Sequence, residues 1–83
     1  MMTDKDLEQK LRQLPLSEIS VRVEGRPGHL VAEVCSPEFR AQGEAVRQQT
    51  VWEFLLEILT DEQRNQVEFV FTVTPEETQE AAA

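Results

Sequence analysis

The chain has very little of the chemistry that metal sites and covalent catalysis require. Its 83 residues include one cysteine, Cys35, and one histidine, His29, at the two ends of one predicted strand. A strand advances about 3.3 Å per residue, so these side chains lie roughly 20 Å apart. They therefore cannot share a zinc or iron–sulfur site within this chain. The same separation excludes a Cys–His nucleophile pair, and we expect a protein that is not an enzyme.

The sequence also lacks the features of secreted and membrane proteins. No apolar run approaches the roughly 20 residues that span a bilayer, and the N-terminal residues are polar and acidic. A single cysteine cannot close an internal disulfide, which agrees with a reducing compartment. We therefore expect a cytoplasmic protein that has no contact with a membrane.

Positive charge is scarce, above all in the second half of the chain. The net charge is −8, and residues 42–83 hold two Lys or Arg against nine Asp or Glu. Nucleic-acid binding depends on Lys and Arg that neutralise phosphates. The charge distribution therefore argues against direct binding of DNA or RNA.

Hydrophobic periodicity divides the chain into helices and strands. Apolar residues recur at helical spacing over residues 3–14 and about 44–59, and they alternate at strand spacing over 18–24, 29–35 and 67–73. Serine and threonine N-caps predict short helical turns before and after the second long helix. The predicted order is helix, strand, strand, helix, short helix, strand.

The first two predicted strands are joined by a segment with strong turn chemistry. Residues 25–28, Gly-Arg-Pro-Gly, combine glycines that accept positive φ with a proline of fixed φ, which predicts an antiparallel hairpin. A helical crossover after a hairpin favours a third strand parallel to the second. The predicted fold class is α+β, with a three-stranded mixed sheet covered on one face by helices.

The third strand has an apolar alternation that assigns its faces. Val67, Phe69, Phe71 and Val73 share one predicted face, and Val70 lies on the other. This pattern predicts a strand that is partly covered on both sides.

The composition also predicts how far the folded domain extends. We expect one domain over residues 1–75, because the chain is short and contains no linker. The acidic, alanine-ended segment 76–83 has nothing to bury, and we predict that it is a disordered tail.

One stretch of the sequence resembles a known family. The run SPEFRAQGEAVRQQTVWEFL at residues 36–55, with TPEE after the third strand, is similar to the BolA-like proteins. The resemblance covers roughly residues 4–77 and matches the predicted element order. It implies a fold related to the type II KH domain.

The resemblance also implies a function. BolA-like proteins act as non-catalytic adaptors that pair with monothiol glutaredoxins. They share a two-iron two-sulfur cluster with the cysteine and glutathione of the partner. A role in iron–sulfur or redox homeostasis through protein–protein contact is therefore the expected function.

The family's cluster ligands map onto this chain in part. His29 falls at or next to the ligand position in the loop between the first two strands. The family's histidine at the third strand is missing, because Asn65 and Gln66 occupy that region and amides are not normal iron ligands. Cys35 matches no family ligand position, and a small core residue or a redox thiol are its two readings.

We expect the partner contact to involve His29, Phe39, Arg47 and Trp52. More ordinary roles are open for the same residues. His29 can be a solvated strand-end histidine, and Trp52 can pack against the first helix. Arg47 can form a helix salt bridge with Glu44.

Two other functions stay open at this stage. A KH-like nucleic-acid-binding module or transcriptional regulator is the alternative from a different class. A homodimer, formed through the open sheet face or the edge of the third strand, is the second.

Overall fold

The computed structural model describes the backbone of residues 1–82 and the side chains of residues 1–78. The elements in chain order are α1 (Asp4–Leu11), β1 (Ser20–Arg26), β2 (His29–Cys35), the 3-10 helix η1 (Pro37–Ala41), α2 (Glu44–Ile58), α3 (Asp61–Arg64), β3 (Val67–Val73) and α4 (Pro75–Ala82). No helix in this described part of the chain is both long and apolar enough to cross a membrane.

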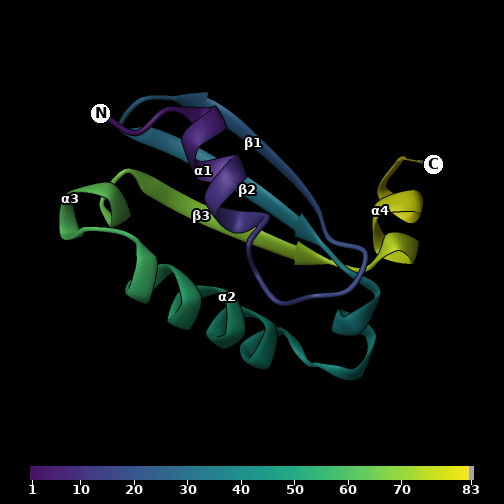
Figure 1. The fold of residues 1–83 in the computed structure, drawn as a ribbon. Helices are drawn as coiled ribbons and strands as arrows, with labels where there is room; N and C mark the ends of the chain where they lie inside the picture. The colour runs from purple at the N-terminus through teal and green to yellow at the C-terminus, as the bar shows by residue number, and fades with distance from the viewer. Residues whose placement is uncertain (83) are drawn as a thin grey trace.

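The three strands form one mixed sheet in the order β1-β2-β3. β1 and β2 are antiparallel, and β3 returns parallel to β2 after the helical crossover. Helix α1 lies against β1 and β2, and α2 runs alongside β3 (Figure 1). The predicted α+β class with a three-stranded mixed sheet is thereby confirmed.

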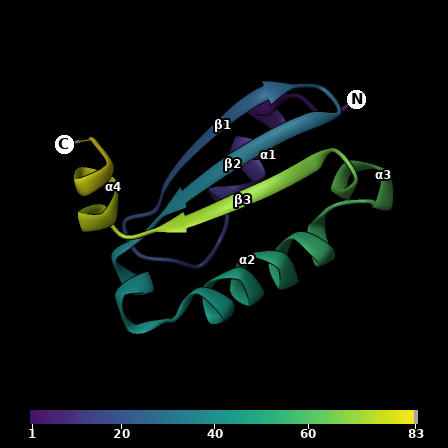
Figure 2. The ribbon, with the colours of Figure 1, turned by 180° about the vertical axis from the view of Figure 1, so that it is seen from behind.

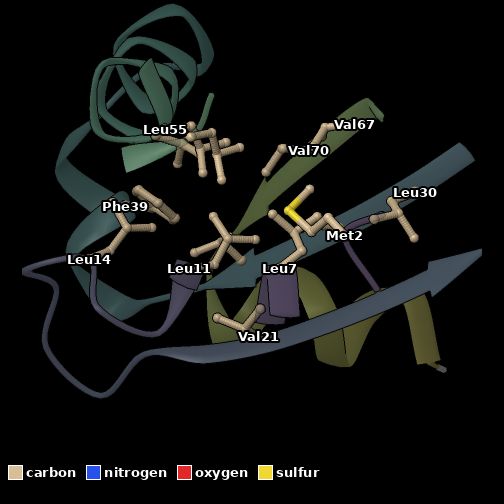
Figure 3. Close-up of a cluster of buried hydrophobic side chains, with 14 residues drawn as sticks. Met2, Leu7, Leu11, Leu14, Val21, Leu30, Phe39, Leu55, Val67 and Val70 are labelled. Carbon is tan, nitrogen blue, oxygen red and sulfur yellow. The ribbon is translucent and has the colours of Figure 1, made fainter. Parts of the chain in front are cut away.

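The core lies between the two long helices and one face of the sheet. Leu7 and Leu11 of α1, Leu55 of α2 and Val70 of β3 point toward one another there, and each is at most 1% exposed (Figure 3). The other face carries no helix over its centre, and Figure 2 views the molecule from that side. We call this surface the open face; its residues include Arg22, Glu24, Val31, Glu33, Phe69 and Phe71.

Helix α1 starts as predicted but ends early. Thr3 and Asp6 form a capping box, with the Thr3 hydroxyl accepting from the Asp6 N–H and the Asp6 carboxylate accepting from the Thr3 N–H. The helix ends at Leu11, whereas the sequence predicted an end near residue 14. Leu14 is nevertheless only 4% exposed, so its apolar character marked burial in the following turn rather than helix.

The predicted faces of β3 were wrong. A bulge shifts the register, so that Leu30 pairs with Val67 while the next residue, Val31, pairs with Phe69. The extra residue breaks strict alternation and rotates the rest of the strand. Val67, Val70 and Thr72 are buried, and Phe69 and Phe71 are exposed on the open face.

The predicted disordered tail was also wrong as far as residue 82, because this segment begins helix α4. The hydroxyl of Thr74 accepts from the N–H of Glu77, and the Glu77 carboxylate accepts from the N–H of Thr74 at 2.7 Å. This is a capping box with proline at the first helical position, a start signal present in the sequence. Residue 83 lies outside the described residues.

Candidate functional site

The hairpin between β1 and β2 presents the single histidine at one end of the sheet. Pro27 and Gly28 form the turn, and the φ of 90° at Gly28 suits a turn position that needs positive φ after proline. Gly25 has a φ of 112°, and a Cβ there would overlap the carbonyl oxygen of His29. The hairpin therefore needs glycine at both positions to place His29 at the start of β2.

His29 lies against a carboxylate from the neighbouring parallel strand. Its Nδ1 is 2.5 Å from Oε1 of Glu68, and both side chains are more than half exposed. An ionised carboxylate only accepts hydrogen bonds, so Nδ1 carries the proton in this pair. The other ring nitrogen, Nε2, is then the one left to contact an external group. Glu68 follows the buried Val67 in β3, so strand alternation places its side chain on the outward side, where it reaches His29.

The region of the family's third-strand histidine holds amides with local roles. Asn65 is the exposed C-cap of α3. Gln66 is 6% exposed, its Nε2 donates to the carbonyl of Glu62 at 3.3 Å, and its Oε1 has no hydrogen-bond partner. Neither residue adds a soft donor beside His29. Among the described residues, no three His, Cys, Asp or Glu side chains come together in a metal-binding group.

Cys35 is half-buried at the far end of β2 from His29. The hydroxyl of Thr78, on α4, lies 3.9 Å from its Sγ. The start of α4 thus partly covers the thiol. His29 and Cys35 lie at opposite ends of one strand, as the spacing predicted.

The structure contradicts the predicted partner contacts of Phe39 and Arg47. Phe39 is 0% exposed within the core, and Arg47 is 9% exposed. Both lie near the end of the sheet opposite the hairpin, because η1 and the start of α2 follow the end of β2 (Figure 1). Neither side chain offers a surface to a partner, and they do not join His29 in one site.

Arg47 instead connects four separate segments. Its Nε donates to the carbonyls of Phe39 and Gln42 at 3.0 and 2.8 Å, and its Nη1 donates to the carbonyl of Thr72 and to Glu77. The guanidinium also lies 5.7 Å from the Phe39 ring centroid. The predicted pairing with Glu44 is absent, because Glu44 accepts from Gln48 and Thr72. Arg47 is thus a structural residue.

Trp52 is half-buried and packs against the edge of the core. Its indole N–H donates to Oε1 of Gln48 at 3.2 Å, and the Gln48 amide donates to the carbonyl of Val70 at 2.8 Å. This chain of bonds holds the indole ring against the β3 side of the domain. Part of the Trp52 side chain remains exposed, so its predicted contact with a partner stays a prediction.

Sequence reasoning missed three residues that the structure brings to the surface of β3. Glu68 pairs with His29, and Phe69 and Phe71 stand on the open face with about half of their surfaces exposed. The bulge places Phe69 and Phe71 outward, and it depends on pairing with β2, which is not encoded in the local alternation.

Two solved structures are similar to this chain over nearly its full length. A bolA protein homologue from Coxiella burnetii shares 28% sequence identity, with a TM-score of 0.65, over 95% of this chain and 99% of that chain. A bol-like protein from Babesia bovis shares 17% identity, with a TM-score of 0.57, over 100% of this chain and 96% of that one. The second likeness concerns the fold alone.

No protein-family model matches the sequence, and no curated protein matches it. The structural likeness and the residues of the 36–55 stretch agree with each other. In fold and over nearly its full length, the chain is similar to a BolA protein homologue, in agreement with the resemblance seen in its sequence.

Proposed function

We propose that the protein is a non-catalytic adaptor that docks to a monothiol glutaredoxin through the hairpin end around His29. The similarity to BolA-like structures supports protein–protein contact as its mode of action. The single observation that carries the proposal is the exposed imidazole at the hairpin, whose Nδ1 is held by Glu68, which leaves Nε2 for contact with a partner.

The residues present do not fit the family's two-ligand hold on an iron–sulfur cluster. His29 supplies one imidazole nitrogen, and Asn65 and Gln66 supply no second soft donor. Glu68 is a hard oxygen donor and is already engaged with His29. Docking is therefore proposed as a protein contact that does not depend on conventional cluster sharing.

The test mixes the purified chain with a reconstituted monothiol glutaredoxin and follows size-exclusion elution, visible absorption and circular dichroism. We expect co-elution with the wild-type chain and at least roughly tenfold weaker association with His29→Ala. Gln9→Ala changes an exposed residue of α1; it is the control and should bind as wild type. Fluorotryptophan at the single tryptophan, Trp52, reports by ¹⁹F NMR whether the α2 side joins the contact.

Two outcomes overturn the proposal. The first is the absence of co-elution together with an unchanged visible spectrum. The second is association that His29→Ala leaves intact, because the contact then lies elsewhere. A salt-dependent shift of labelled DNA or RNA by the isolated chain would favour the KH-like alternative, which the net charge of −8 opposes.

A further inference from the structure

The open face carries two large apolar side chains that the core does not use. Phe69 is 48% exposed and Phe71 is 51% exposed. Their ring centroids lie 4.6 Å apart with an interplanar angle of 55°, so they form a single aromatic patch. Contiguous exposed apolar surface on a small domain marks an interaction site more often than isolated apolar residues do.

The exposure of this pair follows from a specific feature of the backbone. Without the bulge, alternation would place Val67, Phe69 and Phe71 on one face, and Val67 is buried in the core. The bulge inserts one residue and turns both rings outward. Bulges commonly re-aim side chains beside functional sites.

A shallow hollow of about 140 Å³ lies next to the aromatic patch. It is lined by Arg22, Glu24, Val31, Ala32, Glu33 and Phe71. In the sheet register Val31 lies beside Phe69, and Glu33 lies beside Phe71. The hollow therefore has an apolar wall on the β3 side and a charged wall on the β1 side, with room for a side chain of a partner.

The charges around the hollow are unbalanced. Arg22 is the cation of this wall, and its guanidinium lies 3.8 Å from Glu24 and 3.7 Å from Glu33. Two carboxylates thus share one guanidinium, and Glu68 adds another carboxylate beside Phe69. The rim of the apolar patch is net negative, so it complements a positively charged surface. A second copy would bring the same negative rim and a further net charge of −8.

We propose that the open face is a second docking surface, which binds a protein segment whose apolar side chains are flanked by lysine or arginine. The apolar side chains contact Phe69 and Phe71 and enter the hollow beside Val31. The flanking cations pair with Glu24 and Glu33. This proposal does not rest on the glutaredoxin contact, which concerns the hairpin end.

The experiment titrates the full chain with a synthetic amphipathic helical peptide of leucine and lysine and maps amide shifts by ¹H–¹⁵N NMR. A peptide with glutamate in place of each lysine is the matched probe. We expect the lysine peptide to shift the amides of β2 and β3 around the patch and the glutamate peptide to leave them unchanged. Raised salt should weaken the binding.

The double variant Phe69→Thr, Phe71→Thr removes the aromatic patch and keeps both the net charge and the β-propensity of the strand. We expect it to bind the lysine peptide at least roughly tenfold more weakly. Leu56→Gln, which removes an apolar residue 53% exposed on α2, is the control and should bind as wild type. Circular dichroism checks that both variants are folded.

Three results would overturn the inference. One is binding that the double variant leaves unchanged, because attraction to the acidic chain as a whole then suffices. Another is a set of shifts confined to α2 or to the hairpin turn. The third is a dimer in light scattering that the double variant dissociates, because a second copy then covers the face.

Discussion

The two faces of the sheet are built from the same strands but meet different surroundings. On β2, Leu30, Ala32 and Val34 face the helices and are at most 1% exposed. The alternate residues Val31 and Glu33 face the open side and are only half-buried. One face specifies the fold, and the other is available to carry function.

The difference is sharpest on β3, where both faces hold large or branched side chains. Val70 is 1% exposed on the covered face, and Phe71, the next residue, is 51% exposed on the open face. Hydrophobicity alone therefore does not say which face a residue joins. The pairing with β2 decides it.

The largest expected effect is the difference in stability between two variants, one that truncates a phenylalanine of the core and one that truncates a phenylalanine of the open face. Phe39→Ala empties a fully buried site and should lower the free energy of unfolding by about 3–5 kcal/mol. Phe71→Ala removes a ring that is 51% exposed and should cost less than about 1.5 kcal/mol. Urea unfolding followed by circular dichroism measures both. Equal losses for the two variants would show that the open face is as structural as the core.

A second comparison uses two arginines. Arg47→Met leaves the carbonyls of Phe39, Gln42 and Thr72 without their donor and should cost about 2–4 kcal/mol. Arg22→Met, on the open face, breaks two exposed ion pairs and should change stability by about 0.5 kcal/mol or less. The same urea experiment applies. A stability loss for Arg22→Met as large as that for Arg47→Met would show that the open face contributes as much to stability as the buried side of the sheet.

The element order and the sheet topology were accessible from the sequence because their signals are local. Alternation in β1 and β2, the glycines of the turn and the threonine caps of α1 and α3 act over a few residues. The parallel third strand follows from a general rule of connection. These features agreed with one another, and the α+β prediction was correct.

The errors arose where distant segments decide the outcome. The bulge at Glu68 depends on register with β2, so local alternation misassigned Phe69. The burial of Arg47 needs acceptors from η1, β3 and α4 at once. Helix α4 is a different case, since the capping signal at Thr74 is local and was outweighed by the acidic composition.

The third prediction concerns the loss of folding stability at low pH, and its expected effect is the smallest of the three. Hydrogen bonds from the Thr74 backbone and from Arg47 hold the pKa of Glu77 below its ordinary value of 4.5. A folded-state pKa below the unfolded one gives stability that is present above about pH 4.5 and is lost as the pH falls through the folded value.

Glu77→Gln removes this carboxylate, so the wild type should be more stable than the variant at neutral pH. The difference should shrink as the pH falls below 4.5, where Glu77 of the wild type becomes protonated. Thermal unfolding from pH 7 to pH 3 measures it. In the Arg47→Met background the same substitution should have a weaker pH dependence, because one of the causes that lower the pKa is absent. A difference that grows toward low pH would contradict this prediction, because the carboxylate of Glu77 would then not stabilise the folded state through its contacts with Thr74 and Arg47.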